Sequence, residues 1–172
     1  MRVFKKKYKK DFISLQPANL YGEGDNFDLY SSHVIPALVK KFHIAKQRQN
    51  YKVEIWGSGN VKREFLNVDD LAEAILFSLE NWSLNNDNAP RDPTNKKLAW
   101  LNVGSSEEIT IKDLAEKIAK IIGYQGEINW DISKPDGTPR KLMDSSRIRS
   151  LGWKPLISLD EGLQKTINYI KG

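Results

Sequence analysis

One stretch, residues 13–42 (ISLQPANLYGEGDNFDLYSSHVIPALVKKF), constrains the fold more strongly than any other part of the chain. A short apolar run over 12–16 predicts a buried strand that ends at a proline. A polar loop over 19–32 follows, and we expect a helix to begin near His33, with the serine pair at 31–32 as its cap. The order strand, loop, helix is typical of ligand sites in α/β proteins, because loop amides are available and a helix N-terminus is electropositive.

The remaining pattern alternates between strands and helices. The nearly all-apolar run over 98–103 predicts a strand covered on both faces, as in a parallel sheet. Asp69 and Thr110 are the expected N-caps of two helices, Gly123 is an expected helix stop, and 158–161 has the capping-box pattern. We therefore expect an α/β fold with strands at 51–56, 62–66, 98–103 and 127–131, helices at 33–49, 70–81, 110–122, 145–151 and 158–170, and polar loops at 82–97 and 133–141.

Composition and charge exclude several classes of protein. The sequence has 172 residues, 40% of them hydrophobic, which is enough for one domain with a core. Mean hydropathy is −0.55 and no apolar run reaches membrane-spanning length, so we expect no membrane helix. The absence of cysteine excludes disulfides and thiolate metal sites, and no secretory signal is present, so we expect a soluble, cytoplasmic protein. The net charge of +5 comes partly from a lysine-rich start, which we interpret as solvated surface charge rather than a nucleic-acid site.

Candidate catalytic groups are few. The sequence contains no Gly-rich dinucleotide motif, no P-loop and no histidine pair at metal-binding spacing, so we expect no metal site. Of the two histidines, His43 lies well inside a predicted helix and is expected to pack or face solvent. His33 lies at a helix start directly after the polar loop, and imidazole exchanges protons near neutral pH. His33 is therefore either a general acid/base or a hydrogen-bonding group at the helix start.

Basic and aromatic residues near the two polar loops are candidate ligand groups. If the loops converge, a basic cluster would form from Lys41, Arg63, Arg140 and Lys141. An arginine fork suits phosphate oxygens, and the alternative is scattered surface charge. Trp56 ends a predicted strand before a Gly turn, where an indole either stacks on a ligand or packs in the core.

Four segments, taken in order, resemble the GDP-L-fucose synthases, a branch of the extended short-chain dehydrogenase/reductase family. They are PANLYGEGDNF…SHVIPALVKKFH, WGSGNVKREFLNVDDLAEAI, LNVGSSEEITIKDLAEKIAKIIGY and SKPDGTPRKLMDSSRIRSLGW. The segments REFLNVDDLAEAI and LGW are shared by many nucleotide-sugar members. The segments SHVIPAL and KPDGTPRK look specific to this branch.

The resemblance implies both a fold and an activity. Members convert GDP-4-keto-6-deoxy-mannose to GDP-fucose by epimerising C3 and C5 and reducing the C4 ketone with NADPH. Residues 12–172 would be the C-terminal substrate-binding part, with strands near 12–16 and 98–103 at the end of an incomplete Rossmann sheet, and residues 1–11 would be the remnant of an upstream helix. The Gly-rich turn, the catalytic Ser and Cys and the Tyr-x-x-x-Lys pair have no match here. We therefore expect this chain alone to have no reductase activity and to bind NADPH poorly.

The resemblance also implies a role for each matching position. Contacts to NADP would come from Pro17, Ala18, Asn19, Leu20 and His33. Contacts to the substrate would come from Lys41, Trp56, Arg63 and Asp136. His33 matches the general acid/base of the epimerisation, and Arg63 would reach the GDP diphosphate. Lys41 stands where the family has arginine, which keeps the charge but loses the bidentate fork.

The expected partner is a GDP-sugar. The family is usually a homodimer built from helices in the half that this sequence does not match. Two alternatives stay open: another nucleotide-sugar epimerase or reductase of the same family, or a non-catalytic module that binds an anionic partner through its basic start.

Overall fold

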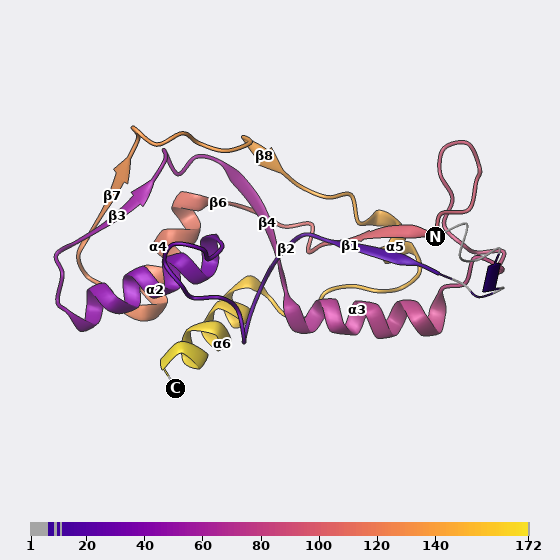
Figure 1. Ribbon diagram of the computed structural model, residues 1–172, viewed down its shortest axis with the longest axis horizontal. Coiled ribbons are helices and arrows are strands. Elements are labelled where there is room, and N and C mark those ends of the chain that lie inside the picture. The colour runs from indigo at the N-terminus through magenta and orange to yellow at the C-terminus, as the bar shows by residue number, and fades with distance from the viewer. Residues whose placement is uncertain (1–6, 9, 11, 172) are drawn as a thin grey trace.

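The computed structural model describes residues 7–8, 10 and 12–171. The prediction that residues 1–11 are a helix remnant lies largely outside them. The described chain forms two packed regions joined by a group of strands (Figure 1).

We call the first region the pocket lobe. It contains α2 (Val34–Gln47), β3 (Lys52–Trp56), α4 (Ile111–Ile122), β7 (Glu127–Asp131) and α6 (Leu159–Lys171). We call the second region the arm. It contains β1 (Ser14–Pro17), α3 (Val68–Asn81), β5 (Trp100–Val103) and α5 (Ser146–Ser150). The connecting strands are β2 (Asn19–Tyr21), β4 (Lys62–Asn67), β6 (Glu108–Thr110) and β8 (Arg140–Lys141).

Most of the strand pairs are parallel. β1 pairs with β5, from Ser14 opposite Trp100 to Pro17 opposite Val103. β2 pairs with β4 and β3 with β7, also in parallel, and β8 joins β4 in the same direction. Only β6 runs antiparallel to its partner β4 among the strands of the described residues. The predicted α/β class with parallel strands is confirmed.

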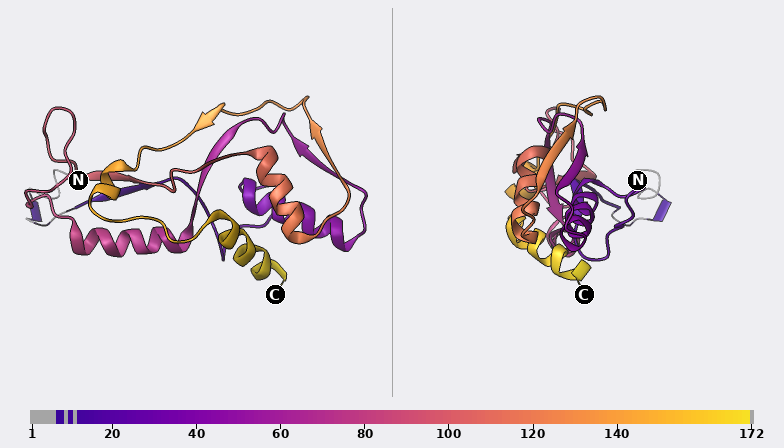
Figure 2. Two further views of the ribbon diagram at one scale, coloured as in Figure 1. Left: turned by 180° about the vertical axis from the view of Figure 1, so that it is seen from behind. Right: turned by 90° about the vertical axis from the view of Figure 1, so that its left-hand side faces the viewer.

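Each region has its own hydrophobic core. In the pocket lobe, apolar residues recur at helical spacing along α2 and α4, so each helix buries one stripe against the other. The stripe of α2 includes Leu38, Val39 and Phe42, which are fully or almost fully buried. The core of the arm is smaller and joins α3 and α5 to the β1–β5 pair around Leu101 and Ile148. Seen from behind, α3 runs alongside this pair, whereas α2, α4 and α6 gather at the other end (Figure 2).

Three predicted helix ends are confirmed in atomic detail. The Thr110 hydroxyl accepts a hydrogen bond from the Asp113 amide at 3.0 Å, and Gly123 ends α4 with a φ of +78°. Before α6, the Glu161 carboxylate accepts from the Ser158 amide at 3.0 Å, and the Glu161 amide donates to the Ser158 hydroxyl at 3.3 Å. This is the reciprocal capping box that the sequence pattern indicates.

Two predicted caps were wrong. α3 begins at Val68, and its cap is Asn67, whose side chain accepts from the Asp69 amide at 2.9 Å. Asp69 is therefore the donor to the cap rather than the cap itself. α2 has His33 at its N-cap position, with no side-chain cap hydrogen bond. The serine pair at 31–32 precedes that position, and the Ser31 hydroxyl bonds to Asp28 at 2.9 Å instead.

Two strand predictions also need correction. The polar loop predicted over 19–32 begins with β2, which exists because β4 supplies its backbone partners from far along the sequence. The strand predicted over 98–103 is the shorter β5 and is not covered on both faces. Leu101 and Val103 lie in the arm core and are buried, but Trp100, which alternates with them along the strand, is 39% exposed.

Candidate functional site

A cavity of about 760 Å³ opens in the pocket lobe. It lies between the start of α2, the ends of β2 and β3, the outer part of β4 and the loop after β7. Its lining includes seven of the nine residues predicted to touch cofactor or substrate, namely Asn19, Leu20, His33, Lys41, Trp56, Arg63 and Asp136. Pro17 and Ala18 do not line it, because they lie at the end of the β1–β5 pair in the arm, where the Ala18 amide donates to the Val103 carbonyl at 2.9 Å.

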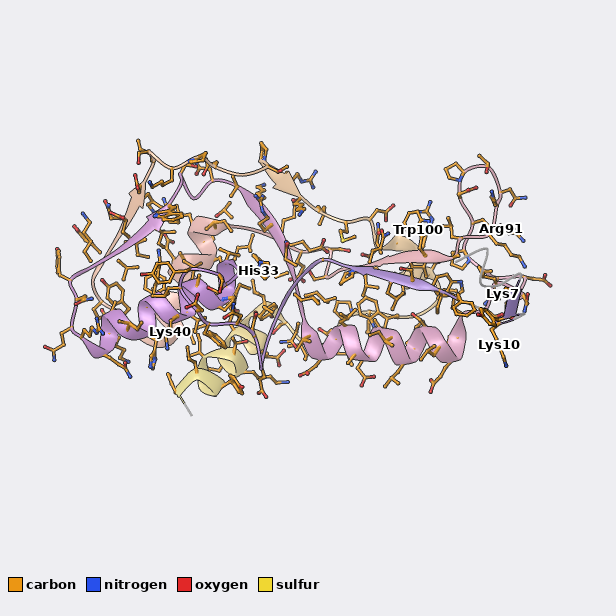
Figure 3. All side chains as sticks on the ribbon, in the orientation of Figure 1. Lys7, Lys10, His33, Lys40, Arg91 and Trp100 are labelled. Atoms are coloured by element: carbon orange, nitrogen blue, oxygen red, sulfur yellow. The ribbon has the colours of Figure 1, made fainter. Side chains whose placement is uncertain are left out.

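His33 stands at the entrance of α2 with its side chain exposed. Its backbone is extended, with φ −72° and ψ 173°, and its carbonyl accepts from the Ala37 amide at 3.0 Å to begin the helix. Because the imidazole makes no cap hydrogen bond, the alternative role of a hydrogen bonder at the helix start finds no support. Figure 3 shows the labelled His33 at the cavity end of the molecule, far from Arg91 and Trp100 in the arm.

Trp56 and two lysines form a cationic and aromatic rim. Trp56 ends β3 and is 67% exposed, which settles the sequence alternative against core packing. The Lys41 ammonium lies 6.0 Å from the indole centroid and donates to the Glu54 carbonyl at 2.9 Å. The Lys134 ammonium lies 5.6 Å from the same centroid. Cations over an indole face are favourable partners, and the exposed ring leaves room for a planar ligand to stack.

Asp136 is fixed by the turn that follows β3. Its carboxylate accepts from the Ser58 amide at 2.9 Å and from the Ser58 hydroxyl at 2.6 Å. These hydrogen bonds, with a smaller contribution from the Arg63 charge, hold the pKa of Asp136 below its ordinary value. Gly57 makes the approach possible, since its φ is +86° and a Cβ there would lie 2.5 Å from the Asp136 carboxylate.

Arg63 lines the cavity and at the same time holds the loop after β7. Its Nη1 donates to the Thr138 carbonyl at 2.6 Å and to the Lys62 carbonyl at 2.7 Å. The basic cluster predicted from sequence forms only in part. Arg140 binds Glu108 through two hydrogen bonds, Nε to Oε1 at 2.7 Å and Nη2 to Oε2 at 2.8 Å, and lies outside the cavity lining.

Sequence reasoning missed Ser58 and Lys134. Ser58 lies in the Gly-Ser-Gly turn, where the flanking glycines and the following Asn suggest only a tight turn. Its partner Asp136 is 78 residues away, so no local pattern pairs the two. Lys134 is the first residue of the KPDG segment, and its place in that segment was the one available signal.

The arrangement suits an anionic ligand that also carries a flat group. Two cations on the cavity wall, Lys41 and Arg63, accompany an exposed indole, and His33 lines the same cavity. Among the described residues, no group of His, Cys, Asp or Glu is arranged to hold a metal ion, and no helix is long and apolar enough to cross a membrane.

Comparisons with known proteins agree with this geometry. The chain is 49% identical over 159 residues to "Probable GDP-L-fucose synthase 1" of Oryza sativa subsp. japonica, which covers 92% of this chain and 44% of that protein. Among solved structures, a GDP-6-OMe-4-keto-L-xylo-heptose reductase from C. jejuni matches with a TM-score of 0.84 and 33% identity, over 98% of this chain and 56% of that one. The GDP-mannoheptose C4 reductase MlghC from Campylobacter jejuni, solved with NADP bound, matches with a TM-score of 0.78 and 31% identity, over 99% of this chain and 56% of that one.

The resemblance indicated by the four sequence segments is thereby confirmed, and the chain spans about half the length of the curated relatives it matches. A family model described as "NAD dependent epimerase/dehydratase family" matches residues 1–89, which is more than half of the 172 residues. The chain belongs to the NAD dependent epimerase/dehydratase family.

Proposed function

We propose that this chain provides the GDP-sugar site of a GDP-L-fucose synthase, the enzyme that forms GDP-L-fucose from GDP-4-keto-6-deoxy-D-mannose. One observation carries the proposal. The residues that a GDP-sugar site needs come from four separate segments of the sequence and line a single cavity. The curated relatives with this name, at up to 49% identity, support the choice of substrate.

The GDP part of the substrate would bind at the cationic rim. Arg63 and Lys41 would neutralise the diphosphate, and Trp56 offers its exposed ring for stacking. In the structure, the Nη1 of Arg63 donates to a neutral carbonyl, that of Thr138. Diphosphate binding through this nitrogen would exchange a neutral acceptor for an anionic one, which makes a stronger hydrogen bond.

His33 would exchange protons with the sugar carbons. C3 and C5 flank the C4 ketone, so the electron pair left by removal of a proton from either carbon delocalises onto the carbonyl oxygen. A neutral imidazole can take such a proton from the ring face that it meets, or a protonated one can deliver a proton there, and inversion requires a second acid/base group on the opposite face. The side chain of His33 is exposed and makes no cap hydrogen bond, so it is free to approach a sugar held at the rim.

The proposed cofactor is NADPH, which supplies hydride to C4 when bound. The residues present fit only one end of it. Asn19 and Leu20 line the cavity near His33, as a nicotinamide contact requires. The sequence has no Gly-rich strand-to-helix turn for the pyrophosphate, and the Gly-Ser-Gly turn is occupied by Asp136. Weak NADPH binding by this chain alone remains our prediction.

Titration calorimetry with GDP tests the proposal directly. We expect the chain to bind GDP, and Arg63→Ala to weaken binding by about tenfold or more, since hydrogen bonds to charged groups contribute about 1.5–3 kcal/mol. Arg91→Ala is the matched control, because Arg91 lies in the arm loop and its Nη1 donates to the Asn95 carbonyl rather than into the cavity. No binding of GDP, or an equal loss in both variants, would overturn the proposal.

A second candidate is another GDP-sugar epimerase or reductase of the same family. Two solved reductases that match this chain, at 33% and 31% identity, are named for GDP-heptose substrates, whereas two matching UDP-sugar epimerases are 25% and 23% identical. The higher identities favour a GDP-sugar over a UDP-sugar enzyme. A thermal-shift panel of GDP- and UDP-sugars separates the fucose assignment from this second candidate. Stabilisation by GDP-fucose above that by other GDP-sugars supports the fucose assignment.

A further inference from the structure

Glu64 is a buried carboxylate for which the proposed function has no use. It lies on β4 between Arg63 and Phe65, and only 1% of its surface is exposed. Because side chains alternate along a strand, Arg63 and Phe65 line the cavity while Glu64 faces the opposite side. Within the described residues no lysine or arginine forms an ion pair with it.

The Glu64 carboxylate binds two backbone amides instead. Oε1 accepts from the Ser106 amide at 2.6 Å, and Oε2 accepts from the Met143 amide at 2.9 Å. Ser106 has a φ of +63°, a conformation that non-glycine residues rarely adopt, so this hydrogen bond holds an unusual backbone in place. Gly104 leaves room for the carboxylate, since a Cβ there would lie 2.8 Å from Glu64 Cδ.

Met143 ends the segment that forms one wall of the cavity. This segment, residues 133–143, is otherwise attached to the site through the Asp136 carboxylate on Ser58 and through the Thr138 carbonyl on Arg63. The Lys62 amide adds a third contact by donating to the Pro139 carbonyl at 2.9 Å. Further along the segment, β8 pairs with β4 and Arg140 binds Glu108 at 2.7 Å. The segment is thus held from the cavity side at its middle and from the opposite side of β4 at its end.

We propose that Glu64 is a positioning residue for the site. By binding the Met143 amide, Glu64 anchors the end of segment 133–143 to β4. This anchor limits how far the segment can move away from Ser58, and so keeps Asp136 and the 135–137 turn against the cavity. Glu64 acts through the segment and touches no ligand. The part of this inference that concerns ligand affinity rests on the proposed GDP-binding function, whereas the part that concerns the segment does not.

Asp70 provides a matched control. It is also a buried carboxylate, 2% exposed, and it also accepts from two backbone amides, those of Leu156 at 2.8 Å and Ile157 at 3.2 Å. None of these three residues lines the cavity. Loss of either carboxylate leaves an amide with a poorer acceptor and lowers stability, but only loss of Glu64 releases the cavity wall.

The test compares Glu64→Gln with Asp70→Asn by backbone hydrogen exchange and by GDP titration. We expect Glu64→Gln to raise exchange at amides 136–143 by about tenfold and to weaken GDP binding by about tenfold, as expected when a hydrogen bond of about 1.4 kcal/mol is lost. Asp70→Asn should lower thermal stability about as much as Glu64→Gln does. Its exchange rates at amides 136–143 and its GDP affinity should stay within about twofold of those of the unaltered chain. Gly104→Ala, which displaces the carboxylate without altering it, should repeat the Glu64→Gln result.

The outcomes separate this inference from the proposed function. Unchanged exchange at 136–143 in both Glu64→Gln and Gly104→Ala would overturn the positioning role, whatever happens to stability. Equal effects of Glu64→Gln and Asp70→Asn on the segment would do the same. If the unaltered chain binds no GDP but Glu64→Gln still speeds exchange only in this segment, the positioning role stands and the proposed function fails.

Discussion

In the pocket lobe, α2, α4 and α6 bury residues such as Phe42, Ile118 and Ile167 completely, each at 0% exposure. In the arm, α3 is equally apolar in sequence but buries only Asp70, Ala74 and Ser78. Ile75, Leu76 and Leu79 on the same helix are 45%, 54% and 68% exposed. The two regions therefore use similar helices and reach very different degrees of burial.

The difference arises from the number of layers. The lobe packs its helices on one another and on strands, so that each apolar stripe meets a partner. In the arm, α3 packs only against the two-stranded β1–β5 sheet and the short helix α5, which together cover one side of it. The cavity lies in the lobe, so the proposed binding groups are mounted on the more completely packed part of the molecule.

The largest difference should appear when one apolar residue of each region is replaced by alanine. Phe42→Ala removes a ring that contacts Tyr124, with 5.4 Å between centroids, and should cost about 3–5 kcal/mol in the free energy of unfolding. Leu79→Ala in α3 should change it by less than about 0.5 kcal/mol, because little of the side chain is buried. Urea denaturation followed by circular dichroism measures both. A loss of about 2 kcal/mol in Leu79→Ala would show that something covers this face of α3 in solution.

Elements with strong local patterns were predictable from sequence. The Thr110 cap and the Ser158–Glu161 box involve residues three apart, and the apolar stripe of α2 repeats within one helix. β2 was missed because its stability depends on pairing Asn19 with Phe65, far along the chain. The α3 cap was misplaced because Asn67 and Asp69 are both good capping residues, and only the backbone shows which oxygen accepts.

The site was predictable as a set of residues but not as a network. The resemblance named Arg63 and Asp136, yet their present partners, Thr138 and Ser58, are 75 and 78 residues away in sequence. The carboxylate of Glu64 depends likewise on Ser106 and Met143. Long-range contacts of polar groups carry no periodic signal, so only the folded chain shows them.

A smaller effect should distinguish the uncapped site helix from the capped helix of the arm. At the start of α2, a serine at position 33 could accept from the Ile35 amide, whereas Pro36 has no amide to offer. We expect His33→Ser to raise the free energy of unfolding by about 0.5 kcal/mol, while Asn67→Ala at the α3 cap should lower it by about 1 kcal/mol. Urea denaturation again measures both. A loss of stability in His33→Ser would mean that the imidazole has a structural role, which would weaken its assignment to proton exchange.

The smallest effect concerns pH and should also be confined to the lobe, since both histidines of the sequence lie there. Burial, followed by the charges of Lys40, Lys171 and Lys46, lowers the pKa of His43 below its ordinary value. The unfolded chain therefore binds this proton at a higher pH than the folded chain does. His43 contributes full stability above about pH 6.5, and that contribution is lost as the pH falls from there toward the folded-state pKa. Urea midpoints should fall between pH 7.5 and pH 5.5 in the unaltered chain, and should fall less in His43→Gln. Equal slopes in the two would show that protonation of His43 does not lower the stability of the fold.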